Sequence, residues 1–152
     1  MLANPPQEDM GMASDLQRLG LAIKRVQDRH HRALDAALIG IGTTLAQWNA
    51  LRAIARHPES SSHKLAGLTF QTDQSFGALA NRMVDRGLIR RVAGEGRAIL
   101  HHLTPEGERL LDAGKAVAEG VLASSFAPLA KAERAQLQAL LAKMLGDDAA
   151  RA

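Results

Sequence analysis

Residues 70–91, FQTDQSFGALANRMVDRGLIRR, contain the pattern that decides the fold. Four apolar side chains recur there at the spacing of one helical face, which predicts an amphipathic helix: Phe76, Leu79, Ala80 and Met83. The opposite face carries a different set, namely Gln74, Ser75, Ala78, Asn81, Arg82 and Asp85. A helix face that only meets solvent more commonly pairs Lys with Glu four residues apart. The short polar groups on this face therefore indicate another role.

This polar face matches the needs of a DNA recognition helix. In a major groove, Gln pairs with adenine and Arg with guanine, Ser bonds to either base, and Ala contacts the thymine methyl group. Gly77 lowers helix stability by about 1 kcal/mol relative to Ala. Close approach of the backbone to DNA and tight packing on the preceding helix both explain this glycine. Asp73 is interpreted as complementing the helix dipole, with a contact to a cytosine amino group as the alternative.

The segments on either side complete a DNA-binding pattern. A short helix is predicted for residues 63–68, followed by the turn TFQT, with Thr72 as N-cap of the next helix. His63 begins the short helix near a phosphate, and Lys64 is assigned to the same DNA-binding surface. After Gly87, residues 89–92 and 97–103 are predicted to be two strands joined by AGEG.

The predicted hairpin carries a cluster of positive charge. Arg90 and Arg91 lie on its first strand and Arg97 lies at its tip, so the hairpin can place an arginine in a minor groove. Residues 60–104 hold six Lys and Arg residues against three acids. This local excess favours a polyanionic partner, with an ordinary solvated surface as the alternative. The GEG tripeptide is not interpreted as a phosphate-binding loop, because no helix follows it.

Long leucine-rich segments flank this region. A helix of about seven turns is predicted from Ser14, its expected N-cap, with an apolar row that includes Leu16, Leu19, Ile23, Val26, His30, Leu34 and Leu38. A second helix follows Thr43 or Thr44, and two more follow Thr104–Pro105 and Pro128. The outer apolar rows are expected to need a second subunit, with packing inside one chain as the alternative. Residues 1–13 are predicted to be a disordered tail.

Composition limits the remaining possibilities. A chain of 152 residues with 46% apolar and 23% charged residues is expected to form one globular domain over residues 14–152. No apolar run approaches the roughly 18 residues of a membrane helix, and no signal segment is present, so a cytoplasmic protein without a membrane partner is expected. The chain has no cysteine, which excludes disulfides and thiolate chemistry.

Six histidines raise the question of a metal or catalytic site. His30–His31 and His101–His102 are adjacent pairs whose side chains diverge, and neither HExxH nor a Ser/His/Asp arrangement occurs. We therefore predict no enzyme activity, no metal and no cofactor. His30 is interpreted as a core histidine, with a ligand-pocket group or a metal ligand as alternatives. Trp48 is assigned to the core, and the candidate ligand pocket comprises His30, Trp48 and Arg52.

Three runs resemble the winged helix-turn-helix regulators of the MarR family: LAQWNALRAIARHPESSSHKLAGL (45–68), TDQSFGALANRMVDRGLIRR (72–91) and GRAILHHLTPEGERLL (96–111). The resemblance covers about residues 14–146. It implies a mainly α fold with a small two-strand wing and an intertwined helical homodimer. Residues 43–104 would form the DNA-binding lobe, and residues 14–42 and 105–146 the dimerisation helices.

The resemblance also implies a pseudo-palindromic double-stranded operator and release from it by a small, often aromatic, ligand. It places the polar face quoted above on the recognition helix and Arg97 at the wing tip. The wing is about two residues shorter than usual, with Gly96 where an aspartate is common, and Phe70 stands where the turn often has glycine. Phe70 is therefore expected to fill a gap in the core.

The resulting prediction is a ligand-responsive transcriptional repressor. Two alternatives are a protein-interaction module that reuses the winged fold and a metal-responsive regulator that uses the histidines. The DNA-binding residues predicted for the repressor are Gln74, Ser75, Gly77, Ala78, Asn81, Arg82, Arg91, Arg97, His63 and Lys64.

Overall fold

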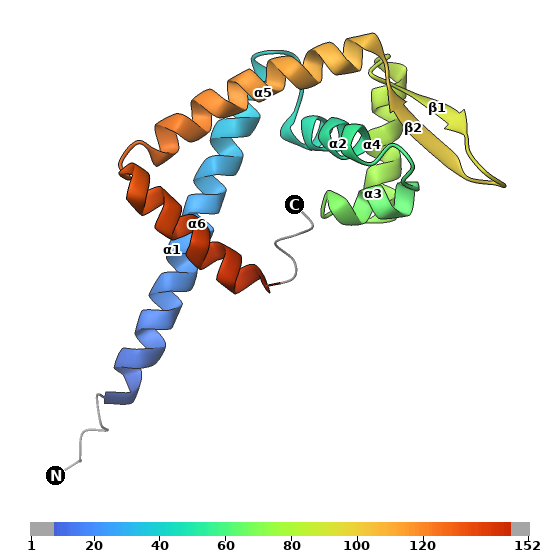
Figure 1. The fold of residues 1–152 in the computed structure, drawn as a ribbon. Coiled ribbons are helices and arrows are strands. Elements are labelled where there is room, and N and C mark those ends of the chain that lie inside the picture. Colours follow the sequence, from blue (N-terminus) through green and yellow to red (C-terminus); the bar gives the residue numbers. More distant parts are fainter. Residues whose placement is uncertain (1–7, 147–152) are drawn as a thin grey trace.

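The computed structural model describes residues 8–146, with side-chain positions from residue 14 onward (Figure 1). Its elements in chain order are α1 (Glu8–Ile39), α2 (Leu45–Arg56), α3 (Ser62–Leu68), α4 (Asp73–Asp85), β1 (Ile89–Ala93), β2 (Ile99–Leu103), α5 (Pro105–Phe126) and α6 (Lys131–Leu145). Strands β1 and β2 form one antiparallel hairpin. The element order and the mainly helical fold class with a two-strand wing are those predicted from the sequence.

Figure 1 shows two regions joined by α5. Helices α2, α3 and α4 gather with the β hairpin near the start of α5, and α1 and α6 lie toward its other end. The core of the first region has seven fully buried large side chains: Phe76, Leu38, Leu51, Ile54, Leu65, Met83 and Ile89. Because the apolar face of α4 contributes Phe76 and Met83 to this core, its polar face is directed outward.

Threonine side chains fix where three of the helices begin. The hydroxyl groups of Thr44, Thr72 and Thr104 each accept a hydrogen bond from a backbone N–H three residues further on. Gly87 follows α4 with a φ of 71°, a conformation that glycine adopts without a steric penalty. These caps were predicted from the sequence, and they set the boundaries of the recognition helix and of α5.

Helix α1 begins earlier than predicted. It includes Glu8, so Ser14 lies inside the helix and is not its N-cap, and residues 8–13 are helical instead of belonging to a tail. The predicted disorder of residues 1–7 lies outside the described residues.

The β hairpin also differs from the prediction in one strand. Strand β2 begins at Ile99, two residues later than expected, and Arg97 lies in the turn. The Gly94 N–H donates to the Ala98 carbonyl oxygen at 2.8 Å, which closes the hairpin before Ile99. Gly96 has a φ of 63° within this turn. Residues 97 and 98 therefore belong to the turn, although the sequence pattern alone assigned them to β2.

The expectation that Phe70 fills a core gap is wrong. Its side chain is 97% exposed and its φ is 55°. The α3–α4 turn needs a left-handed backbone at this position, which a residue other than glycine rarely adopts. That backbone directs the ring away from the core into solvent.

The outer helices carry apolar rows that one chain does not cover. The first part of the α1 row is exposed, from 43% at Ile23 to 73% at Leu16, whereas Leu38 at its end is fully buried. Helix α6 has no buried residue, and Leu140, Leu141, Met144 and Leu145 are all exposed. These two rows therefore do not pack on each other within one subunit. No helix within residues 8–146 combines the length and apolar character required to cross a membrane.

Candidate nucleic-acid interface

The outward face of α4 presents the residues that the sequence proposed for base reading. All five side chains are exposed: Gln74, Ser75, Ala78, Asn81 and Arg82. The Thr72 hydroxyl both caps the helix and donates to the Ser75 hydroxyl oxygen at 3.0 Å. The cap thus orders the first turn of the helix, where a recognition helix contacts base edges.

Gly77 lies in the middle of this exposed region. A Cβ atom built on it would meet nothing within 4 Å in the described chain. Tight packing on the preceding helix therefore does not explain the glycine. Close approach of a partner to the α4 backbone is the other explanation, and it stays a prediction.

Helices α3 and α4 are joined at their N-terminal ends by a histidine and an aspartate. The His63 Nδ1 atom lies 2.9 Å from one Asp73 carboxylate oxygen and 3.0 Å from the other. The Nδ1–H group is the donor in this pair, because a carboxylate only accepts. Asp73 is in the first turn of α4, as the dipole interpretation requires, and its carboxylate is bound to His63. Lys64 follows on the exposed start of α3.

Within the described residues, one side-chain hydrogen bond links the β wing to the recognition helix. The Arg91 Nη2 group donates to the Asn81 side-chain oxygen, which links β1 to α4. The sequence treated Asn81 and Arg91 as separate DNA contacts, and the structure brings them together. Arg97 is exposed in the turn of the hairpin, and no ion pair of Arg97 occurs in the described part of the chain. Its guanidinium group can therefore reach a partner.

Sequence reasoning missed a structural role for Arg86. This residue caps α4, and its two terminal nitrogens donate to the Gln47 side-chain oxygen and to the Gly42 carbonyl oxygen, both at 2.6 Å. The Thr43 hydroxyl donates to the same Gln47 oxygen at 3.1 Å, and Gln47 is buried. The end of the recognition helix is thereby tied to the α1–α2 connection. A glutamine in the apolar part of α2 was the available signal, because a buried amide needs partners.

The structure brings two residues of the predicted ligand pocket together, Trp48 and Arg52, and places His30 elsewhere. Trp48 is buried, and its Nε1–H donates to the Leu111 carbonyl oxygen at 3.1 Å. Arg52 stacks over the Trp48 ring with 4.7 Å between the guanidinium carbon and the ring centroid. Burial and the neighbouring Arg56 both lower the pKa of Arg52, with burial the larger cause. Arg52 lines a cavity of about 230 Å³ between α2 and the α3–α4 turn.

His30 lines a different cavity, of about 570 Å³, between α1 and α5. Its Nε2 atom contacts the Ser125 hydroxyl, and its ring meets the Phe126 ring edge-on at 5.2 Å. His30 is thus a partly buried, hydrogen-bonded cavity residue and not a fully buried one. In the region that the structure describes, no three His, Asp or Glu side chains form a group suited to a metal ion.

A helix-turn-helix with an exposed polar recognition face and an arginine-bearing β hairpin beside it defines a winged helix-turn-helix DNA-binding protein. A sequence model described as MarR family matches residues 41–98. The HTH-type transcriptional repressor Rv2887 of Mycobacterium tuberculosis (strain ATCC 25618 / H37Rv) is 30% identical over 141 residues, which cover 91% of this chain and 100% of the relative. The chain belongs to the MarR family of transcriptional regulators.

Solved structures agree with this assignment. The M. tuberculosis MarR family protein Rv2887 in complex with DNA has a TM-score of 0.71 at 25% identity, covering 83% of this chain and 96% of that chain. The same protein in complex with salicylic acid has a TM-score of 0.70 at 28% identity, covering 83% and 95%. A probable transcriptional regulator from Pseudomonas aeruginosa has a TM-score of 0.71 at 33% identity, covering 82% and 95%.

Proposed function

We propose that the chain is a sequence-specific repressor that binds a pseudo-palindromic, double-stranded operator as a homodimer and releases it when a small aromatic molecule binds. The observation that carries this proposal is the exposed polar face of α4 beside a wing whose arginines have no side-chain partner among the described residues except Asn81. The known complexes of a relative with DNA and with salicylic acid support the same two kinds of partner.

The geometry suggests a distinct role for each part of the interface. Gln74, Ser75, Ala78 and Arg82 would meet base edges, and Gly77 would let the α4 backbone come close to the groove. His63 and Lys64 would approach phosphates from the start of α3. The bond from Arg91 to Asn81 would set the angle of the wing, and Arg97 would enter the flanking minor groove.

The homodimer is proposed because the apolar rows of α1 and α6 have no cover in one chain. A second copy would bury these rows and place two lobes on successive turns of DNA, about 34–36 Å apart. In a dimer, the free energies of base contact from the two lobes add up. One lobe alone would bind its site only slightly more tightly than it binds non-specific DNA. We therefore assign residues 14–42 and 105–146 to dimerisation and residues 43–104 to DNA binding.

For the releasing ligand we propose the His30 cavity between α1 and α5. Its volume of about 570 Å³ is large enough for a small aromatic molecule, and Arg29, His30, Ser124 and Ser125 offer polar groups beside Val117 and Val121. A ligand there would change how α1 meets α5 and hence the spacing of two lobes. The function is regulatory and not catalytic, and we place it in the cytoplasm with the DNA that it requires.

The salt dependence of DNA binding tests the interface and the subunit number together. Fluorescence anisotropy with DNA from upstream of the chain's own gene would give the affinity across a salt series. Each arginine that contacts a phosphate contributes about 1 to the slope of log affinity against log salt. Arg97→Ala should thus lower the slope by about 2 in a homodimer and by about 1 in a monomer.

Two further variants separate base reading from general charge. Gln74→Ala should cost about 1–3 kcal/mol on the preferred sequence and relax the preference at one base-pair position. Arg109→Ala, on the exposed surface of α5 and outside the proposed DNA-binding residues, is the control for loss of one arginine. Equal slopes for the parent, Arg97→Ala and Arg109→Ala would show that the wing does not bind DNA.

The ligand step is tested by titrating salicylate into the preformed DNA complex. Release by salicylate in the parent, with loss of that response in His30→Ala, is the expected result. A His30→Ala variant that releases DNA at the same salicylate concentration would place the ligand elsewhere.

A further inference from the structure

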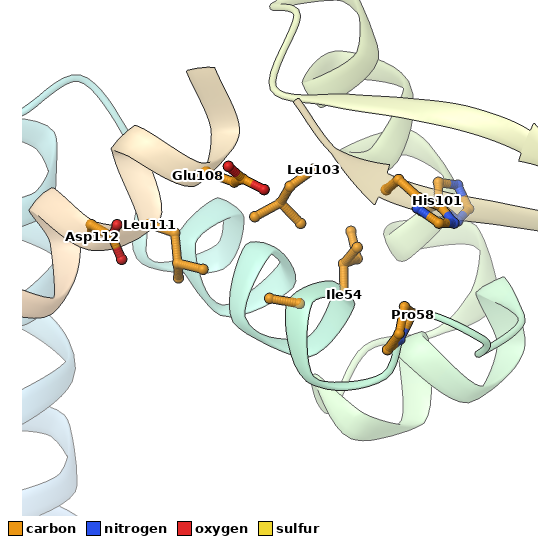
Figure 2. A pocket seen from close by; sticks show the side chains of 9 residues that line it. Ile54, Pro58, His101, Leu103, Glu108, Leu111 and Asp112 are labelled. Atoms are coloured by element: carbon orange, nitrogen blue, oxygen red, sulfur yellow. The ribbon is translucent and has the colours of Figure 1, made fainter. Parts of the chain in front are cut away.

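A third cavity lies in the DNA-binding lobe, between the end of α2, strand β2 and the start of α5 (Figure 2). Its volume is about 390 Å³, and nine residues line it: Ile54, Ala55, Pro58, His101, His102, Leu103, Glu108, Leu111 and Asp112. None of these residues lies on α4 or on the wing tip, and none lines the His30 cavity. The cavity is therefore separate from both sites of the proposed function.

The formal charge of this cavity is negative. Glu108 and Asp112 lie one helical turn apart on α5, so both carboxylates face the same side of the helix. No Lys or Arg is among the nine lining residues. Glu108 lies in the first turn of α5.

One cation lies near the rim of the cavity without lining it. The Lys115 ammonium group is 3.1 Å from an Asp112 carboxylate oxygen, and the two side chains are 63% and 75% exposed. An ion pair this exposed is weak, because water and salt screen it. Asp112 can therefore exchange Lys115 for a cation that also fills the cavity.

The opposite wall contains a buried imidazole with an unused polar atom. His101 is only 3% exposed, and its Nδ1 atom has no hydrogen-bond partner among the described residues. Burial, and to a lesser extent the charge of Arg91, lower the pKa of His101. The ring is therefore neutral near neutral pH and adds no positive charge to the cavity. A neutral imidazole can accept a hydrogen bond from an ammonium group.

The remaining wall is apolar. Figure 2 shows Leu103 and Ile54 between Glu108 and His101, and Leu111 beside Asp112. Aliphatic side chains offer a hydrocarbon surface that a purely inorganic cation would not use. The lining thus combines negative charge, a hydrogen-bond acceptor and an apolar wall.

We propose that this cavity binds a small organic cation, with its ammonium group at Glu108 and Asp112 and its hydrocarbon body against Leu103 and Leu111. An anion such as salicylate is disfavoured here, because both carboxylates would repel it. The inference does not depend on the proposed function, because it concerns binding to the protein without DNA.

Isothermal titration of the full chain without DNA tests this inference with three probes of one shape. The probes are phenethylammonium, the neutral 2-phenylethanol and the anionic phenylacetate, at about pH 7.5, where His101 is neutral. We expect phenethylammonium to bind at least about tenfold more tightly than either of the others, which corresponds to about 1.4 kcal/mol. Its binding should also shift the ¹⁵N resonances of the His101 imidazole.

Charge-neutralising variants locate the site. Glu108→Gln and Asp112→Asn should each weaken phenethylammonium binding by about three- to tenfold. Glu119→Gln removes a carboxylate from the exposed surface of the same helix, outside the cavity, and should leave the binding unchanged. Equal binding of all three probes, no binding of phenethylammonium up to about 10 mM, or an equal effect of Glu119→Gln would each overturn the inference. Thermal melts of the variants verify that they are folded.

Discussion

Helices α2 and α5 meet at a contact so close that one added methyl group should disrupt it. A Cβ atom on Gly114 would lie 2.1 Å from the Trp48 Nε1 atom and 2.4 Å from its Cδ1 atom. Carbon atoms in ordinary contact are about 3.5–4.0 Å apart, so Gly114→Ala forces the indole ring to move by more than 1 Å. The ring is buried and its Nε1–H is bonded to the Leu111 carbonyl oxygen, and Arg52 covers its face.

The cost of this substitution follows from three contributions. Overpacking a filled core costs about 1–3 kcal/mol, and losing the bond from Trp48 to Leu111 costs about 1 kcal/mol. Replacing glycine by alanine within a helix returns about 1 kcal/mol. We therefore expect Gly114→Ala to lower the free energy of unfolding by about 1–3 kcal/mol, and Tm by about 2–4 °C for each kcal/mol.

The assay has a built-in reporter, because Trp48 is the only tryptophan in the chain. Urea unfolding followed by its fluorescence gives the stability, and the emission of the folded state reports whether the indole has moved. Gly120→Ala is the matched control on the same helix, because a Cβ atom there would meet nothing within 4 Å in the described chain. It should stabilise the protein by up to about 1 kcal/mol. If Gly114→Ala proves as stable as Gly120→Ala, with unchanged emission, the described α2–α5 contact is incorrect.

Three other predictions concern the DNA-binding lobe. Gly77→Ala should stabilise the fold by about 0.5–1 kcal/mol and yet weaken operator binding. An unchanged affinity in an anisotropy titration would show that DNA does not approach the α4 backbone closely at Gly77. The pKa of His101 is lowered from its ordinary value of 6.5, so the unfolded chain takes up its proton first as the pH falls. Neutral His101 should contribute fully to the free energy of unfolding above about pH 6.5, and this contribution should be lost as the pH falls below that value. The urea midpoint of His101→Gln should therefore depend less on pH than the midpoint of the parent. Arg86→Met should cost about 1–3 kcal/mol in chemical denaturation, because the Gly42 carbonyl oxygen loses its donor and the Gln47 oxygen keeps only Thr43 as a donor; an unchanged midpoint would show that these bonds contribute nothing.

The features that could be predicted from the sequence are those set by local chemistry. The apolar spacing from Phe76 to Met83 predicted which face of α4 is buried. Thr72 and Thr104 were recognised as caps because a hydroxyl before a helical run satisfies a free backbone N–H. These signals need only a few neighbouring residues, so they are visible without the fold. The exposure of the α4 polar face follows from the same pattern.

The features that could not be predicted depend on residues far apart in the chain. Arg86 and Gln47 are separated by 39 positions, and nothing near either residue indicates that they meet. Asn81 and Arg91 come together only because the hairpin folds back on α4. The exposed ring of Phe70 reflects the backbone of the turn, which overrides the general tendency of phenylalanine to be buried.

The exposed apolar rows of α1 and α6 affect how stable the folded protein is at its concentration in a cell. In the proposed pair, unfolding sets two chains free, so every tenfold dilution lowers the free energy of unfolding by about 1.4 kcal/mol. Copy number would then govern the lifetime of the folded regulator as well as its occupancy of DNA. A scarce regulator of this kind would melt at a lower temperature than an abundant one of identical sequence.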